Sequence, residues 1–267
     1  MKQKNGFSGQ LGFVFAAAGS AVGVGNLWRF PYLAAKDGGG LFLIIYLILV
    51  FTVGFTLLTT DIAIGRKTGK SAIYAYQEMK KKWKFLGILT FFVPVLIMTY
   101  YAVIGGWILK YITIYLTGSG KEAVESNCFT NFISSPSSVW FGLIFMFLTA
   151  LIVYNGVEKG IERVSKFIMP ILLLMVIGIA IFSLTLKHPL EDGTVRTGLQ
   201  GLKVYLTPDV KGLTVTRFLQ ISLDAMSQLF FSLSVSMGIM ITYNGIEWNA
   251  MEWNGIEWNG MEWNGME

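Results

Sequence analysis

The stretch from Leu11 to Gly40, LGFVFAAAGSAVGVGNLWRFPYLAAKDGGG, constrains the fold of this chain more than any other segment. It is long and apolar enough to span a bilayer, yet Gly12, Gly19, Gly23 and Gly25 interrupt its apolar part. Asn26 and Arg29 follow where hydrocarbon would lie. Glycine lets the backbone leave helical dihedral angles, so residues 19–25 are predicted to unwind at membrane depth. Unpaired backbone groups are costly in lipid, so such a break needs a cavity or a ligand around it. The pattern therefore indicates a binding site built from backbone groups.

The rest of the chain has the composition of a multi-pass membrane protein. Hydrophobic residues make up 54% and charged residues 14%, and the mean hydropathy is +0.58. The first apolar segment is too long, and too polar inside, to be the core of a cleavable signal peptide. The single cysteine, Cys128, predicts no internal disulfide. Six transmembrane helices are predicted, at roughly 11–35, 41–65, 85–116, 139–155, 164–186 and 218–243.

Basic residues gather in three regions that alternate along the chain. They precede the first segment, fill the loop after the second, and recur in the loop after the fourth. The positive-inside rule places these regions in the cytoplasm, and segments 117–138 and 187–217 outside. We therefore expect a cell membrane, plasma or bacterial inner, with the N-terminus cytoplasmic. The run KKKWK beside a span is typical of a topology signal or a lipid head-group contact, so no nucleic-acid partner is predicted.

The last residues, 244–267, repeat with a five-residue period that never changes length. One unit, GMEWN, back-translates to GGA ATG GAA TGG AAT, which is GGAAT three times over. Translated simple-sequence DNA accounts for this repeat better than a selected Trp-rich interfacial segment does. We therefore divide the chain into a domain at 1–243, with about six transmembrane helices, and an artefactual, disordered repeat at 244–267.

Four motifs follow one another in the order of a known family. They are AGSAVGVGNLWRFPYLAAKDGGG, TYYAVIGGW at 99–107, the pair Gly160 and Pro170, and SQLFFSLSVSMGIMITY at 227–243. These resemble the first, third, fifth and broken sixth helices of the neurotransmitter:sodium symporters, the LeuT-type family, especially its bacterial amino-acid branch. The resemblance implies an all-α polytopic membrane protein with two inverted five-helix repeats. This chain would hold the first repeat and the broken sixth helix.

The resemblance implies two sodium sites made largely of oxygens released by the broken first helix. The carbonyls of Gly19 and Val22 would belong to one site. The Ala21 carbonyl and the Asn26 side chain would belong to the other. Ser232 of the sixth helix would also be a sodium ligand. Unwound carbonyls suit Na⁺, the coupling ion, and no other cofactor is expected. Taken alone, the glycine spacing fits a helix-packing face equally well.

The family's substrate site, carried over position by position, would be lined by Ser20, Ala21, Gly23, Val24, Gly25, Ile97, Tyr101, Phe231, Ser232, Ser234 and Met237. Monoamine carriers of the family have aspartate at the Gly23 position, so glycine favours a substrate that brings its own carboxylate. Met237 is flexible and suits a large apolar or aromatic side chain. An interfacial aromatic belt, the alternative role for Tyr101, suits Tyr100 better. Serines in the sixth helix can also bond back to their own helix, and Ser236, where the family commonly has glycine, leaves the substrate size open.

Other residues resemble the gates of the family. Arg29 resembles the outer-gate arginine, whose acidic partner belongs to helix ten. Lys4 and Phe7 stand where the family usually has the arginine and tryptophan of the inner gate. Gly160 and Pro170 would allow the fifth helix to unwind, so that water reaches the second sodium ion. For Asp224, the sequence indicates no partner.

The sequence thus favours a sodium-coupled symporter of a neutral, hydrophobic or aromatic amino acid, working by alternating access in a lipid bilayer. The resemblance is compatible with a homodimer. An enzyme is not expected, because His188 is the only histidine and lies in a predicted outer loop. The alternative is a truncated, non-transporting fragment of such a symporter, since helices seven, eight and ten would carry the remaining sodium ligands and the gate acid.

Overall fold

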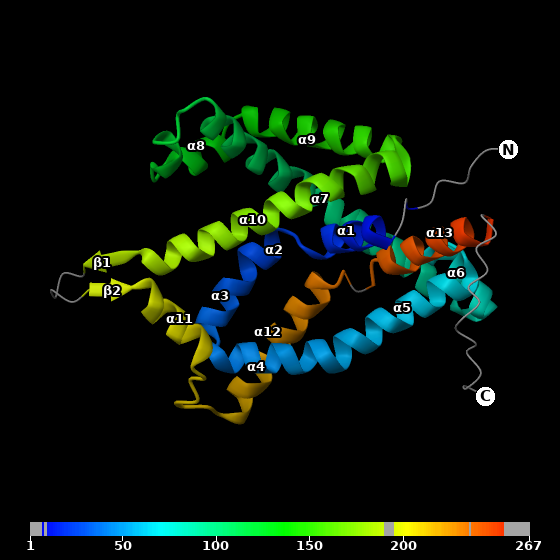
Figure 1. The fold of residues 1–267 in the computed structure, drawn as a ribbon, viewed down its shortest axis with the longest axis horizontal. Coiled ribbons are helices and arrows are strands. Elements are labelled where there is room, and N and C mark those ends of the chain that lie inside the picture. The colour runs from blue at the N-terminus through cyan, green and yellow to red at the C-terminus, as the bar shows by residue number, and fades with distance from the viewer. Residues whose placement is uncertain (1–6, 8–9, 190–194, 235, 254–267) are drawn as a thin grey trace.

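The computed structural model describes residue 7 and residues 10–189, 195–234 and 236–253. Helices form most of this part of the chain (Figure 1). The α-helices are α1 (Gln10–Ala21), α2 (Val24–Leu27), α3 (Arg29–Lys36), α4 (Gly40–Leu49), α5 (Phe55–Thr68), α6 (Ala72–Met79), α7 (Lys84–Leu116), α8 (Cys128–Ile133), α9 (Ser137–Tyr154), α10 (Arg163–Thr185), α11 (Gly198–Leu206), α12 (Val215–Ser232) and α13 (Ile239–Trp253). The π-helical turns are η1 (Val50–Gly54) and η4 (Val157–Glu162), and the 3₁₀ turns are η2 (Lys81–Trp83) and η3 (Glu122–Val124). Strands β1 (Lys187–Pro189) and β2 (Val195–Thr197) form an antiparallel hairpin.

Within the described residues, four helical stretches are long and apolar enough to cross a membrane: Gly40–Thr68, Lys81–Leu116, Ser137–Tyr154 and Val157–Thr185. A fifth span is formed if the bent pair of α1 with α2 and α3 counts as one. In the last two of the four stretches, 0% of the apolar window is buried within the chain, so these helices present apolar side chains outward, as in a bilayer. The predicted all-α, multi-pass membrane fold is confirmed.

The first break in the bundle lies between α1 and α2. The two parts of this span meet at 65°. The predicted break over residues 19–25 is too long, because only Val22 and Gly23 leave the helix. The Val22 amide still donates to the Ala18 carbonyl at 2.8 Å, so helical bonding holds up to Ala21. Gly23 alone takes an extended conformation, with φ −131° and ψ −175°.

The second break separates α12 from α13. Ser234, Ser236 and Gly238 have φ angles of 53°, 67° and 67°, in the left-handed region that ends a helix. A Cβ atom on Gly238 would lie 2.4 Å from the Cβ of Ala72, so the close approach of α6 also requires glycine there. The Ser234 hydroxyl donates to the Ser20 carbonyl at 3.0 Å. The predicted broken sixth helix is therefore present, and it is bonded to the end of α1.

Helix α13 corrects the predicted disorder of the repeat for its first ten residues. The helix runs through Tyr243 to Trp253 without interruption. Asn244 is buried, and its side chain packs against Gly65 of α5. A Cβ atom on Gly65 would lie 3.0 Å from the Cβ atom of Asn244, so glycine is what leaves room for this side chain. Asn244, the first residue of the repeat, thus extends the packing of α13 on α5. Residues 254–267 lie outside the described residues.

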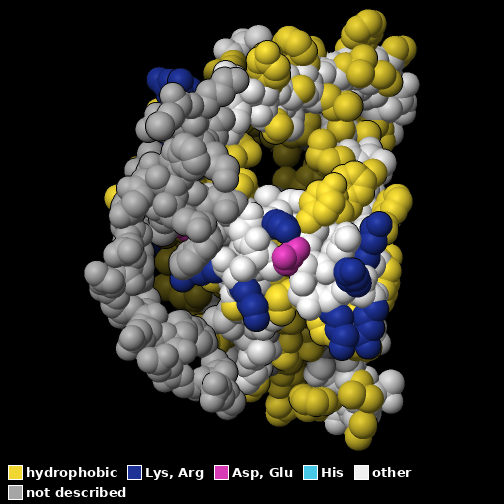
Figure 2. Space-filling view, turned by 90° about the vertical axis from the view of Figure 1, so that its right-hand side faces the viewer, with side chains coloured by type: hydrophobic (Ala, Val, Ile, Leu, Met, Phe, Trp, Pro, Cys, Tyr) yellow, Lys and Arg dark blue, Asp and Glu magenta, His cyan; other side chains and the backbone are white. Residues whose placement is uncertain are grey.

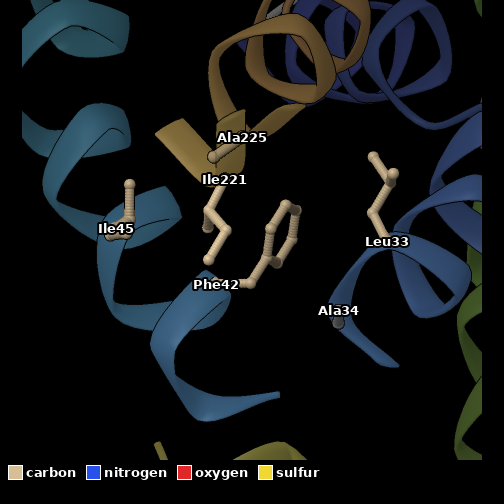
Figure 3. Packing of buried hydrophobic residues seen from close by; sticks show 6 residues of the cluster. All are labelled: Leu33, Ala34, Phe42, Ile45, Ile221 and Ala225. Atoms are coloured by element: carbon tan, nitrogen blue, oxygen red, sulfur yellow. The ribbon is translucent and has the colours of Figure 1, made fainter. Parts of the chain in front are cut away.

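The main apolar core joins α3, α4 and α12. Figure 3 shows the Phe42 ring of α4 between Ile221 of α12 and Leu33 of α3. Ala34 and Ala225 are fully buried beside them, because their small side chains let the helices approach. This core holds the halves of the two broken helices against each other, and so fixes the distance between the breaks.

Lys36 and Asp224 form an ion pair that supplements this core. The Lys36 Nζ lies 3.2 Å from Asp224 Oδ2 and 3.9 Å from Asp37 Oδ1. Burial raises the pKa of the Asp37 carboxyl above its usual value. The neighbouring Lys36 charge offsets only part of this rise. The pair gives Asp224 the partner that the sequence did not indicate, and it holds the end of α3 against α12.

The glycine triplet 38–40 lets the loop after α11 pack against the start of α4. Gly39 forms an isolated bridge with Pro208, and its φ is +58°. A Cβ atom on Gly39 would lie 2.0 Å from the Val204 carbonyl oxygen. The backbone of α11 therefore leaves no space for a side chain at this position.

Gly39→Ala is expected to destabilise the chain by about 3 kcal/mol, because it combines left-handed strain with a backbone clash. Gly118→Ala is the matched control, since Gly118 has φ +77° and no atom of the described residues lies within 4 Å of where its Cβ would be. It is expected to cost only about 1 kcal/mol. Thermal unfolding in detergent compares the two variants, and equal shifts of the midpoint would contradict the packing described for Gly39.

Candidate functional site

A cavity of about 410 Å³ lies where the two helix breaks meet α7. Nine of the eleven residues predicted to bind substrate line it: Ser20, Ala21, Gly23, Val24, Ile97, Tyr101, Phe231, Ser234 and Met237. The polar side chains in the lining are Ser20, Ser234 and Tyr101, and most of the other lining side chains are apolar. Such a site suits a small molecule with one polar end and one apolar end.

The other two predicted substrate residues, Gly25 and Ser232, are not among the lining residues. Gly25 is buried against the Phe231 ring, where a Cβ atom would lie 2.1 Å from Phe231 Cε1. Ser232 is also buried, and its hydroxyl faces Asn26. The Phe231 ring lies 6.3 Å from that of Tyr101, centroid to centroid. Gly25 therefore supports one of the two rings that border the cavity.

An oxygen-rich cluster joins the two broken helices next to the cavity. The Asn26 amide donates to the Ala21 carbonyl at 2.8 Å, and the Ser232 hydroxyl donates to Asn26 Oδ1 at 2.8 Å. Gln228, fully buried, donates from Nε2 to Ser232 Oγ at 3.2 Å. Asn26 thus lies within hydrogen-bond distance of two other predicted sodium ligands, Ala21 and Ser232. Gln228 is a member of the cluster that the sequence did not reveal.

The chemistry of this cluster fits Na⁺. A backbone carbonyl, an amide oxygen and a hydroxyl are neutral, hard oxygen donors of the kind that bind alkali cations at broken helices. The residues predicted for the second site, Gly19 and Val22, both line the cavity. A Cβ atom on Gly19 would lie 3.2 Å from Ser165 Oγ of α10, so this part of α1 faces α10.

The residues predicted to form gates have different surroundings. Arg29 donates to Gln228 Oε1 at 3.4 Å and to Ser227 Oγ at 3.1 Å, which links α3 to α12. The Phe7 ring packs edge-on against Phe13 and Tyr243, each at 5.4 Å between centroids. Lys4 lies outside the described residues. Arg29 thus lies at one end of α12, next to the oxygen-rich cluster.

The segment from Gly160 to Pro170 is helical in this structure. Gly160 belongs to the π-helical turn η4, and Pro170 lies within the continuous helix α10. A Cβ atom on Gly160 would lie 2.0 Å from the Ile152 carbonyl oxygen, so glycine allows η4 to approach the end of α9. The predicted unwinding does not occur in this conformation, and the π turn is the irregularity at this place.

Several residues that line the cavity were not predicted from the sequence: Pro94, Met98, Ile104, Gly105, Ile108, Phe145 and Ile239. Those on α7 recur every three or four residues together with Ile97 and Tyr101, a spacing that marks one face of a helix. This spacing was a usable signal. The sequence contained no comparable signal for Phe145 of α9, because α9 is apolar on all its faces. It reaches the site because Gly105 leaves room, with a Cβ there falling 2.5 Å from the Phe145 ring.

A multi-pass helical bundle with two broken helices bonded to each other at a central cavity is the architecture of a membrane transporter. The profile of the Sodium:neurotransmitter symporter family matches residues 4–138 and 125–254. The chain belongs to the sodium:neurotransmitter symporter family, whose members are transporters and not enzymes.

Individual relatives agree with this assignment. YhdH, a sodium-dependent transporter of Bacillus subtilis, is 37% identical over 244 residues, covering 89% of this chain and 51% of the relative. A sodium-dependent transporter of Methanocaldococcus jannaschii is 34% identical over 90% of this chain and 49% of its own length. The crystal structure of MhsT in complex with L-phenylalanine matches with a TM-score of 0.76 and 34% identity, over 94% of this chain and 57% of that chain. The chain spans about half the length of the curated relatives it matches.

Proposed function

We propose that the transporter domain to which these residues belong is a sodium-coupled symporter of a neutral amino acid with a hydrophobic or aromatic side chain. The observation that carries this proposal is the oxygen cluster of Ala21, Asn26 and Ser232, which adjoins the cavity. A cation held there would lie beside the carboxylate of a bound amino acid. The binding of one would then favour the binding of the other, which is the coupling that symport requires.

The shape and polarity of the cavity support the substrate class. Gly23 adds no charge to the polar end, which leaves space for a substrate carboxylate near the Tyr101 hydroxyl. Ile97 and Met237 provide apolar walls for the side chain of the substrate. The complex of MhsT with L-phenylalanine shows that a relative binds an aromatic amino acid.

Transport would proceed by alternating access across a cell membrane, with the N-terminus in the cytoplasm. Sodium would order the α1–α2 break, and the substrate would then bind below the rings of Tyr101 and Phe231. Closure of these rings together with Arg29 would seal the outer side, and movement of the Phe7 end of α1 would open the inner side.

A second candidate is that the 267-residue chain alone does not transport, which its coverage of about half the length of its relatives favours. A scintillation-proximity assay of substrate binding is applied to the full-length version and to the 267-residue chain. A full-length version, extended to the length of those relatives, is expected to bind a labelled neutral amino acid saturably and only with Na⁺, whereas the 267-residue chain is expected to bind none. Na⁺-dependent uptake by liposomes that contain only the 267-residue chain would overturn the second candidate, and sodium-independent binding by the full-length version would overturn the first.

A further inference from the structure

A dense group of basic residues lies between the second and third spans, where the bent pair of α1 with α2 and α3 is counted as the first. Residues 80–84, KKKWK, which we call the basic turn, follow α6 and lead through η2 into α7. The stretch Gly40–Thr68 ends shortly before α6, and Lys81–Leu116 begins within the basic turn. The basic turn therefore lies where the chain re-enters the membrane.

The packing of α6 fixes the position of the basic turn. Ala72 and Ala75 are buried on one face of α6. A Cβ atom on Gly87 would lie 2.4 Å from the Ile73 carbonyl oxygen, so Gly87 lets α6 approach the first turns of α7. The Trp83 amide donates to the Lys80 carbonyl at 2.8 Å, which closes the 3₁₀ turn. The lysines are thus carried on a folded turn between two packed helices.

The charge of the basic turn is not neutralised by the described part of the protein. All four lysines, Lys80, Lys81, Lys82 and Lys84, are exposed, and none forms an ion pair within that part of the chain. The acid nearest in sequence, Glu78, pairs with Lys70 at 2.7 Å. Figure 2 views this end of the molecule and shows Lys and Arg side chains gathered on one face, next to hydrophobic side chains.

Aromatic and apolar side chains accompany these charges. Trp83 is 42% exposed in the middle of the basic turn, and Phe85 and Met79 on either side are exposed as well. Tryptophan with adjacent lysines is the combination that prefers the head-group region of a bilayer, with the ring at the interface and the charges at the phosphates. A nucleic-acid partner would leave these apolar side chains in water, whereas the head-group region of a bilayer accommodates both the rings and the charges.

We propose that the basic turn is a binding site for the head groups of anionic phospholipids. The lysines would pair with lipid phosphates, while Trp83 and Phe85 insert beside the acyl chains. The site would hold the end of α6 against the membrane surface and so anchor the loop between the second and third spans. It would require neither sodium nor an amino-acid substrate.

Lipid retention by the 267-residue chain tests this proposal. The chain is purified in a mild detergent with equal amounts of phosphatidylglycerol and phosphatidylcholine, and native mass spectrometry counts the bound lipids. Changing Lys80, Lys81, Lys82 and Lys84 together to Gln is expected to lower phosphatidylglycerol retention at least about tenfold. The same four positions changed to Arg should keep it, because the charge is preserved.

The matched control changes four exposed lysines to Gln: Lys121, Lys187, Lys203 and Lys211. They belong to the segment before α8, to β1, to α11 and to the segment before α12, which lie away from α6 in Figure 1. The control variant removes the same charge and should retain the lipid normally. Raising NaCl to about 0.5 M should weaken lipid retention by the unmodified chain, because salt screens exposed charges. Inorganic phosphate, added at constant ionic strength, should not displace the lipid. Equal retention of the two lipids by the unmodified chain, an equal loss in the control, or displacement by phosphate would each overturn the proposal. If the Gln variant does not fold, the Arg variant and the salt titration decide.

Discussion

Replacing Gly23 with aspartate is expected to abolish binding of a neutral amino acid to the full-length version. Gly23 borders the cavity, and a Cβ atom there meets only the Tyr101 hydroxyl among the described residues, at an ordinary contact distance of 3.9 Å. Its φ of −131° also accommodates a side chain. The aspartate therefore fits, and its effect is electrostatic. Two carboxylates about 4 Å apart repel by about 4 kcal/mol at an effective dielectric constant of about 20, which corresponds to roughly a thousandfold loss of affinity.

Gly23→Asn is the control, since asparagine has nearly the same shape and no charge. It should weaken binding far less than Gly23→Asp. A second arm uses an amine that lacks the carboxylate, such as phenethylamine, whose binding should improve relative to phenylalanine in the aspartate variant. Equal affinities of the Asp and Asn variants for phenylalanine would show that position 23 does not face the carboxylate, and the argument for the substrate class would fail.

Replacing Asn26 with alanine is expected to raise the Na⁺ concentration needed for half-maximal substrate binding by about ten- to a hundredfold. The change removes the oxygen that accepts the Ser232 hydrogen bond and the amide that donates to Ala21. Losing a polar partner of a buried charge costs about 1.5–3 kcal/mol. Because the lost oxygen belongs to the ion cluster and not to the cavity lining, affinity at saturating Na⁺ should change less.

A sodium titration of substrate binding separates these effects. Asn155→Ala serves as the control, because Asn155 is exposed and its side chain donates to the Leu151 carbonyl of its own helix, away from the oxygen cluster. That variant should keep the sodium dependence of the parent. If Asn26→Ala keeps it too, Asn26 is no ligand, and the cluster with Ser232 is a structural hydrogen-bond network.

The sequence predicted features that depend on composition and on backbone chemistry. Apolar length located the four long spans and the bent first span, and glycine and serine located both breaks. The sixth predicted span, 218–243, is not among the described helices that are long and apolar enough to cross a membrane, because the break between α12 and α13 divides it. The sequence overestimated the first break, because Gly19 can remain helical while its neighbours keep their hydrogen bonds. Glycine permits unwinding but does not require it. The second break was better located, because Ser234 and Ser236 both adopt left-handed conformations.

Features that depend on contacts between distant segments could not be predicted from the sequence. Gln228 completes the oxygen cluster, yet a glutamine in a helix has no distinctive pattern in one sequence. The Lys36–Asp224 pair joins residues 188 positions apart. Helix α13 continues into the repeat because Asn244 fits beside Gly65, a packing contact that the five-residue period does not reveal.

Uptake into liposomes tests most directly whether the two broken helices form a sodium-coupled site. The full-length version is reconstituted, and accumulation of a labelled neutral amino acid is measured with an inward Na⁺ gradient and with K⁺ in place of Na⁺. Accumulation above the external concentration is expected only with the Na⁺ gradient, and none is expected when a sodium ionophore dissipates that gradient. Equal uptake in Na⁺ and K⁺ would contradict the assignment of a sodium-coupled site to the two broken helices.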